Sequence, residues 1–377
     1  MIPIAKPYLD KEEAESAYSV IMSGWVAQGP KVEEFEKKFC EYTGAEYAVA
    51  VSNCTNALHL SMIVSGISGG DEVICPSMSY IATANSVAYT GGIPVFAEVS
   101  PADYNLDPDN VRSLITVRTK AILVAHQIGM PADIDEFRKI CRDNNLKLIE
   151  DAACAIGSEY KGEKIGVHSE LVCFSFHPRK VMTTGEGGMI TTNNKDYYER
   201  LKLLRQHAIS ISGKERHSSD KLTFEDHLET GYNYRMTDIQ AAIGIKQLGK
   251  LDYIIKERRR IASLYISGLK DIDCIRLPLE PDNRKSNYQS FAIYLNEKSP
   301  LSRNEVMQKL LNEGISVRKG VMTSHRESAY RTKNELRLPV SEDLCDRSFM
   351  IPLYVPMDEK DIFHIINSLR KILKNII

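Results

Sequence analysis

Blocks of apolar residues alternate along the chain with stretches in which apolar and polar residues are mixed. Continuous apolar runs at 47–52, 71–76, 93–99, 119–127 and 146–152 predict strands, and the mixed stretches at 56–66, 81–91 and 135–145 predict helices. Apolar runs this continuous are typical of parallel strands that helices cover on both faces of a sheet. The pattern therefore predicts an α/β fold with a mostly parallel central sheet.

The pattern changes after about residue 237. Residues 237–268 have the periodicity of one long helix, which we expect to bridge two lobes. A strand at 288–296, a helix at 303–314 and a helix at 359–376 then predict a smaller α/β lobe. We therefore expect a large domain over residues 1–245 and a small C-terminal domain over residues 246–377.

Composition and charge narrow the class of protein. The 377 residues are 43% apolar, and 48 basic against 50 acidic residues give a net charge of −2. A nearly neutral chain offers no field for DNA or for an anionic membrane surface, so we expect neither nucleic acid nor membrane as a partner. The eight cysteines form no CxxC pair, and no signal-peptide core or apolar span of ~20 residues is found, which predicts a cytoplasmic protein.

One lysine stands between two apolar runs in the stretch CFSFHPRKVMTTGEGGMI, residues 173–190. The runs on either side predict two strands joined by a turn that contains glycine. Lys180 in that turn is either a solvated charge, as most lysines are, or an amine held in a pocket for chemistry.

Three other positions follow predicted strands, at the edge where ligands bind in open α/β sheets. Residues 52–56 (SNCTN) precede a helix, so their N–H groups and the Thr55 hydroxyl either bind a phosphate or form an ordinary helix cap. Tyr80 is either a flat face for a ring to stack on or a core aromatic. Asp151 ends an apolar strand, where a carboxylate serves either chemistry or a structural cap.

Together these positions fit one cofactor, pyridoxal 5'-phosphate. Its aldehyde needs an amine, its ring nitrogen needs a carboxylate, and its phosphate needs N–H and hydroxyl donors. Lys180, Asp151 and the turn at 52–56 supply these groups in that order. No cluster of His and Cys has the spacing of metal ligands, and neither GxGxxG after the first strand nor GxxxxGK[ST] is present, so we expect no metal and no dinucleotide or P-loop site.

A family resemblance rests on eight stretches in order along the chain. They are SGWVAQGPKVEEFE (23–36), SNCTNALHL (52–60), SYIATANSV (79–87), EDAACAIGSEYKGEKIG (150–166), FSFHPRKVMTTGEGG (174–188), RQHAIS (205–210), GYNYRMTDIQAAIGIKQL (231–248) and LPVSEDL (338–344). In these stretches the chain resembles the DegT-type sugar aminotransferases, which depend on pyridoxal phosphate and belong to the fold-type-I aminotransferase superfamily. The resemblance extends over essentially the whole length.

The resemblance implies a role for several residues. Lys180 would be the Schiff-base lysine, Asp151 would pair with the pyridinium nitrogen, and Tyr80 would stack on the ring. Phosphate contacts are implied for Cys54, Thr55 and Ser175. Asn233, in GYNYR, would reach the phosphate from the neighbouring subunit, so the expected active unit is a homodimer with shared active sites.

The chain departs from the family pattern in two places and has an unusually basic third region. Cys54 replaces the usual glycine of the phosphate turn, and Cys154 stands where glutamine or histidine commonly lies near the ring. The segment 317–330 (VRKGVMTSHRESAY) is more basic than expected, and it either binds a phosphate or diphosphate of the substrate or forms a solvated loop. The candidate substrate ligands are His126, His177, Arg179, Arg318, Lys319 and His325.

The implied reaction is transamination from L-glutamate to a keto sugar linked to a nucleotide, for amino sugars of a surface polysaccharide. A small phosphorylated ketone is the alternative acceptor. A sugar dehydratase of the same fold would replace the lysine with histidine or carry an iron-sulfur cluster, and a regulatory protein on this scaffold would not need Lys180, Asp151 and Tyr80 together.

Overall fold

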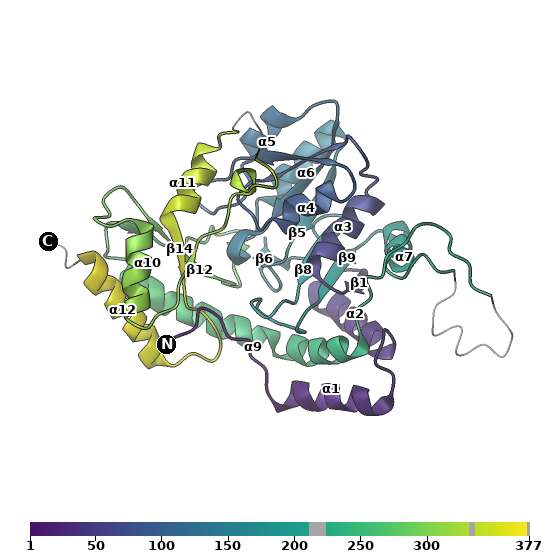
Figure 1. Cartoon of the computed structure of the whole chain (residues 1–377), viewed down its shortest axis with the longest axis horizontal. Helices are drawn as coiled ribbons and strands as arrows, with labels where there is room; N and C mark the ends of the chain where they lie inside the picture. The colour runs from purple at the N-terminus through teal and green to yellow at the C-terminus, as the bar shows by residue number, and fades with distance from the viewer. Residues whose placement is uncertain (211–223, 332–335, 375–377) are drawn as a thin grey trace.

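A seven-stranded sheet forms the centre of the larger lobe in the computed structural model, which describes residues 1–210, 224–331 and 336–374 (Figure 1). The strand order is β1-β9-β8-β5-β4-β2-β3. The strands are β1 (Tyr47–Val51), β2 (Glu72–Pro76), β3 (Ile93–Ala97), β4 (Thr119–Ala125), β5 (Lys147–Asp151), β8 (Leu171–Ser175) and β9 (Gly188–Thr192). Strand β9 runs antiparallel to both its neighbours, and all other neighbours are parallel, which confirms the predicted sheet.

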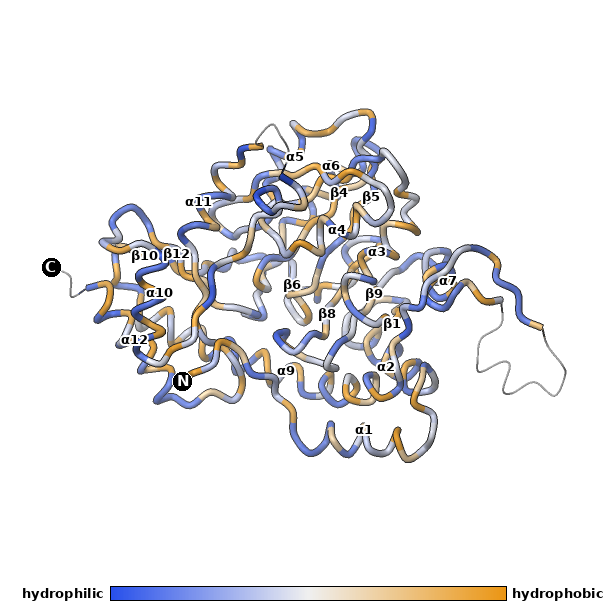
Figure 2. The backbone as a smooth tube through the Cα atoms, viewed as in Figure 1, coloured by the Kyte–Doolittle hydropathy of each residue, from blue (hydrophilic) through white to orange (hydrophobic). Residues whose placement is uncertain are grey.

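Helices cover both faces of this sheet because the strands are apolar on both sides. In β4, Ile122 and Val124 belong to one hydrophobic core, whereas Ala121 and Leu123 belong to the other. The first core continues into the smaller lobe, and the helices that contribute to it in the larger lobe are α2 (Pro30–Thr43), α5 (Pro108–Leu114), α6 (Ile134–Asn144) and the start of α9 (Asp238–Leu269). Those of the second are α3 (Cys54–Val64), α4 (Ala82–Ala88) and α7 (Lys195–Leu204). Figure 2 shows hydrophobic positions along these central elements and hydrophilic positions in many surface loops.

A four-stranded antiparallel sheet forms the smaller lobe. Its order is β10-β12-β14-β13, from β10 (Ile275–Arg276), β12 (Phe291–Leu295), β13 (Arg318–Lys319) and β14 (Ser348–Ile351). The helices of this lobe are α10 (Arg303–Asn312), α11 (Pro339–Arg347) and α12 (Glu359–Lys374). A third, small sheet pairs β11 (Arg284–Lys285) with β6 (Glu159–Tyr160), which also pairs with β7 (Glu163–Lys164), so it links the two parts of the chain.

Helix α9 connects the lobes, as its pattern predicts. It packs against α1 (Lys11–Ser23) and α2 at the larger lobe and against α12 at the smaller lobe (Figure 1). Thr237 and Gln240 start it with a capping box, in which each side chain bonds the backbone of the other. The domain boundary predicted at 245/246 falls inside this helix.

The first residues of the chain join the smaller lobe. Ile2 forms a parallel bridge with Ile315, and Leu353 N–H donates to Ile4 O at 3.3 Å. The N-terminus therefore lies near α10 and α12 (Figure 1). Among the described residues, no helix is both long enough and apolar enough to cross a membrane.

Candidate active site

Lys180 lies in the loop between β8 and β9, the antiparallel pair predicted around it. The loop folds tightly, because Lys180 N–H donates to His177 O at 2.8 Å and the Thr183 hydroxyl donates to Phe176 O at 2.8 Å. The Lys180 side chain is partly buried, and its Nζ lies 3.1 Å from Cys154 Sγ. The amine is therefore held inside the fold and is not a free surface charge.

Asp151 ends β5, the strand next to β8, and the residue is only 8% exposed. Thr83 Oγ1 donates to its Oδ2 at 2.8 Å, and Ala153 N–H donates to its Oδ1 at 3.1 Å. The Thr83 hydroxyl is in turn 2.7 Å from Ser79 Oγ. Two protein donors thus orient a buried carboxylate at the carboxyl edge of the sheet.

The turn at residues 52–56 leads into the first turn of helix α3, where backbone N–H groups point out of the helix. Asn53 Oδ1 caps the helix by accepting from Asn56 N–H at 2.9 Å. In the described part of the chain, the Cys54 and Thr55 N–H groups have no acceptor. A Cβ atom at Gly188 would lie 2.6 Å from the Asn53 carbonyl carbon, so only glycine lets β9 approach this turn so closely. Ser175, which faces Gly188 in the β8–β9 register, borders the same turn.

Electrostatic interactions connect these groups. Burial lowers the pKa of the Lys180 amine, but attraction to Cys154 and Asp151 outweighs it, so the net pKa is raised. Burial, followed by the nearby Asp151 charge, raises the pKa of Cys54 well above its usual value. The cysteine that replaces the family's glycine is therefore a neutral thiol and brings no negative charge to the turn.

The remaining predicted cofactor residues lie at the surface of the single chain. Tyr80, in the loop after β2, is 71% exposed and presents an open aromatic face. Asn233 is exposed, and its neighbour Tyr234 accepts a hydrogen bond from Ser52 N–H at 2.9 Å. The GYNYR segment therefore borders the turn at 52–56, while Asn233 itself is exposed.

The six candidate substrate ligands separate into exposed and enclosed groups. Arg179, Arg318 and Lys319 are exposed, and His177 is half-buried. Burial, with smaller contributions from the charges around it, lowers the pKa of His177, which favours the neutral imidazole. His126 is buried, and its two nitrogens face Glu150 Oε2 at 2.8 Å and Ala132 N–H at 3.0 Å, so neither is free for a substrate.

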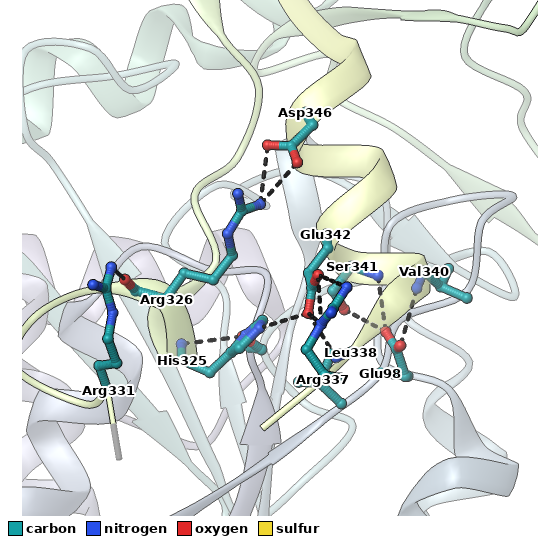
Figure 3. Close-up of polar contacts among 11 residues, drawn as sticks. Glu98, His325, Arg326, Arg331, Arg337, Leu338, Val340, Ser341, Glu342 and Asp346 are labelled. Atoms are coloured by element: carbon teal, nitrogen blue, oxygen red, sulfur yellow. Dashed lines mark hydrogen bonds and ion pairs between the residues drawn. The ribbon is translucent and has the colours of Figure 1, made fainter. Parts of the chain in front are cut away.

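His325 is enclosed by a polar cluster that covers the edge of the larger sheet (Figure 3). Its Nδ1 bonds the Ser77 hydroxyl, and its Nε2 faces Glu342 Oε1 at 3.3 Å. Glu342 also accepts from Arg337, and Arg326 forms an ion pair with Asp346 at 2.9 Å (Figure 3). His325 thus ties the segment after β13 to the loop that carries Tyr80.

Thr83 and Gln289 were not singled out by the sequence patterns. Thr83 lies three residues after Tyr80, at the first turn of a helix that follows a strand. This position near the end of a strand is the sequence feature that could have pointed to Thr83 as a site residue. Gln289 Nε2 donates to Arg179 O at 3.0 Å and fixes the loop beside Lys180. No local pattern indicates that contact, because the two residues are far apart in the sequence.

The donor set fits the cofactor expected from the sequence. A partly buried amine, a buried carboxylate and the open N–H groups of a helix start border one region at the carboxyl edge of the sheet. These are the partners that an aldehyde, a basic ring nitrogen and a phosphate require. Among the described residues, no group of three or more His, Cys, Asp or Glu side chains is placed to hold a metal ion.

Comparisons with known proteins identify several related chains. The chain is 33% identical over 380 residues to the spore coat polysaccharide biosynthesis protein SpsC of Bacillus subtilis, covering 99% of this chain and 97% of SpsC. The crystal structure of the aminotransferase TlmJ from Streptoalloteichus hindustanus is 31% identical, covers 98% of both chains and superposes with a TM-score of 0.90. PseC of Helicobacter pylori, an aminotransferase involved in pseudoaminic acid biosynthesis, is 27% identical over 99% of both chains, with a TM-score of 0.92.

The sequence model of the DegT/DnrJ/EryC1/StrS aminotransferase family matches residues 7–370, which is nearly the whole chain. The predicted fold, enzyme class and cofactor are thereby confirmed. The chain belongs to the DegT/DnrJ/EryC1/StrS family and is an aminotransferase that depends on pyridoxal 5'-phosphate.

Proposed function

We propose that this aminotransferase transfers an amino group from L-glutamate to a keto sugar linked to a nucleotide, in the formation of amino sugars for a surface polysaccharide. The observation that carries the proposal is the enclosed Lys180 amine, 3.1 Å from Cys154 Sγ and within the electrostatic influence of Asp151. The sugar acceptor is supported by relatives whose names concern spore coat polysaccharide and pseudoaminic acid biosynthesis.

Each core residue has a defined chemical role in this proposal. When bound, pyridoxal phosphate supplies an aldehyde that takes up the amino group and a ring that spreads negative charge from the neighbouring carbon. Lys180 would bind that aldehyde covalently, and its Nζ is the group that would hold and move the proton. Asp151, held by Thr83 and Ala153, keeps a negative charge beside the ring nitrogen.

The residues around Lys180 and Asp151 bind the cofactor's phosphate and orient its ring in this proposal. The Cys54 and Thr55 N–H groups, the Thr55 hydroxyl and Ser175 bind the phosphate at the start of α3, where the helix dipole favours an anion. Tyr80 would stack on the ring and exclude water from one face, and Cys154, whose Sγ is 3.1 Å from Lys180 Nζ, would border the ring.

The proposed active unit is a homodimer, in which Asn233 completes the partner's phosphate site. The large domain would span residues 1–245 and the small C-terminal domain residues 246–377. A cytoplasmic location is supported by the eight cysteines, which are all free thiols.

Covalent trapping tests the central assignment. Borohydride reduction of the purified holoenzyme, followed by peptide mass mapping, is expected to find the cofactor on Lys180. Lys180→Arg keeps a positive charge but cannot form the bond, so it serves as the matched control and should carry no reduced adduct. An adduct on another lysine, with Lys180 unmodified, would refute the assignment.

The acceptor is tested in the second half-reaction. The enzyme is first converted to its aminated form with L-glutamate, freed of the donor, and then mixed with single keto compounds. Nucleotide-linked keto sugars are expected to restore the original cofactor absorbance. Restoration by small phosphorylated ketones alone would replace the proposed acceptor with the alternative one.

A further inference from the structure

The Cys154 thiol and the Lys180 amine are in direct contact in the candidate active site. Lys180 Nζ lies 3.1 Å from Cys154 Sγ. Both residues are partly exposed, so a small molecule in solution can reach the pair. In the part of the chain that the structure describes, no other cysteine sulfur lies within hydrogen-bonding distance of a lysine amine. The pair therefore places a thiol beside the amine that the proposed function assigns to the cofactor.

The segment 287–289 holds the backbone on both sides of this contact. Asn287 Nδ2 donates to Cys154 O at 2.9 Å. Gln289 Nε2 donates at 3.0 Å to the carbonyl that directly precedes Lys180. Gln289 N–H also donates to Asn287 Oδ1 at 2.8 Å, so these two anchors are joined to each other. One short segment thus fixes the loop after β5 against the loop between β8 and β9, and the flexible lysine stem needs only a small movement for its nitrogen to reach the sulfur.

The other cysteines of the chain are poorer targets for oxidation. Burial raises the pKa of six of them, which keeps each thiol protonated and slow to react: Cys40, Cys54, Cys75, Cys141, Cys173 and Cys274. Cys345 is buried as well. Cys154 is instead half-buried beside a lysine, which is the environment typical of reactive cysteines.

We propose that Cys154 and Lys180 form a reversible covalent N–S bond when the protein meets hydrogen peroxide. Peroxide first oxidises the Cys154 thiol to a sulfenic acid and is itself reduced to water. The neutral Lys180 amine then attacks the sulfenic sulfur, so that the N–S bond forms, the S–O bond breaks and the hydroxyl leaves as water with a proton from the amine. Over both steps the sulfur gives two electrons to peroxide, and the pair loses two hydrogen atoms. Sulfenic acids condense with nitrogen in this way when the two atoms are adjacent.

The N–S bond removes the amine that the proposed function requires. In the aldehyde form of the holoenzyme the cofactor holds Lys180 Nζ, so the sulfur has no free amine to bond. In the aminated form the amine is free, and this form is therefore the one that peroxide inactivates. Two thiol molecules reduce the bond, restore both side chains and leave as a disulfide. This consequence rests on the proposed function, whereas the N–S bond itself depends only on the contact between Cys154 and Lys180.

The test exposes both cofactor forms of the full-length holoenzyme to hydrogen peroxide and maps the peptides by mass. The aminated form, loaded directly with pyridoxamine phosphate, is expected to give a linked pair of peptides that contain Cys154 and Lys180. This pair should be about 2 Da lighter than the two peptides together, and dithiothreitol should separate it. The aldehyde form should link about tenfold more slowly or less, because bound cofactor leaves little of the amine free. Equal rates in the two forms, with the cofactor mapped to Lys180, would overturn the proposal.

Variants identify the sulfur. Cys154→Ser is expected to give no linked peptides, while borohydride still traps the cofactor on Lys180 and shows that the variant is folded. Cys40→Ser is the matched control, because Cys40 is also a half-buried cysteine, and it should link at the rate of the wild type. Linkage that survives in Cys154→Ser would overturn the proposal. A linked pair about 14 Da heavier than the separate peptides would carry an oxygen between the two atoms and would overturn the direct bond.

The outcome is distinguishable from failure of the proposed function. If borohydride never finds the cofactor on Lys180, the proposed function fails, and the N–S bond is still read from the linked peptides. If Lys180 carries the cofactor, and peroxide oxidises Cys154 to a sulfinic acid without linking it in the aminated form, only the N–S bond is wrong.

Discussion

Thr83 joins the Tyr80 loop to Asp151 through one buried hydroxyl. Because this hydroxyl donates to Asp151 Oδ2 at 2.8 Å, it accepts from Ser79 Oγ at 2.7 Å. All three side chains are buried. Thr83→Val keeps the shape of the side chain and removes both hydrogen bonds, so it isolates the polar contribution.

The expected loss of stability follows from the hydrogen-bonding groups that Thr83→Val leaves without a partner. A hydrogen bond to a charged group contributes about 1.5–3 kcal/mol, and the buried Ser79 hydroxyl also loses its acceptor. We therefore expect Thr83→Val to lower the free energy of unfolding of the apoprotein by roughly 2–4 kcal/mol. Thr83→Ser keeps the hydroxyl and loses one methyl group, which costs about 1 kcal/mol.

Urea unfolding of the apoprotein, compared for the two variants at equal protein concentration, measures this difference. A double-mutant cycle with Ser79→Ala is expected to give a coupling of about 0.5–3 kcal/mol, because Ser79 acts through the hydroxyl that valine removes. Equal stability of the valine and serine variants would show that the hydroxyl bonds neither partner. Additive effects of Thr83→Val and Ser79→Ala would rule out the shared contact.

Three further predictions concern the charge on the ring nitrogen, the pH dependence and the subunits. Asp151→Ala is expected to retain some cofactor but to slow the glutamate half-reaction by about 10²-fold or more in stopped-flow measurements, and near-normal turnover would contradict the role of Asp151. Hydrogen bonding from Arg337 lowers the pKa of Glu342 to about 2. The wild type should therefore be more stable than Glu342→Gln at pH 7, and this difference in the free energy of unfolding should shrink as the pH falls from 4.5 towards 2. A difference that does not change with pH would exclude the ionised pair of Glu342 with Arg337. Lys180→Ala and Asn233→Ala, refolded together, should recover about a quarter of wild-type activity if the site is shared, and no recovery after confirmed exchange would place Asn233 elsewhere.

The larger sheet could be predicted because its strands are buried on both faces. Runs such as residues 119–127 and 146–152 are apolar without interruption, so strand type and parallel pairing followed from the composition of each run. The position of Lys180 in a turn between two strands could be predicted for a related reason, from the apolar runs that flank it and the glycines that follow it. The same pattern left open whether its amine is solvated or enclosed.

The polar partners of the site could not be predicted in the same way. His325 bonds Ser77, which precedes it by 248 positions, and Thr83 in α4 bonds Asp151, which follows it by 68 positions. Such pairs depend on the order of the strands in the sheet and on where the smaller lobe packs against the sheet's edge. A basic segment therefore suggested a substrate role for His325, although its environment in the fold is a closed set of hydrogen bonds.

The bridge between Ile2 and Ile315 affects the order in which the chain can fold during synthesis. Residues 2–4 are made roughly 300 residues before the strand-like partner that receives them, an interval on the order of 15–60 s. Until residue 315 is made, Ile2 has no bridge partner, although the last strand of the larger sheet ends at Thr192. The smaller lobe is consequently the last part of the chain to fold. Release of the nascent chain before residue 315 is made would leave Ile2 without its partner and open to contact with other apolar surfaces.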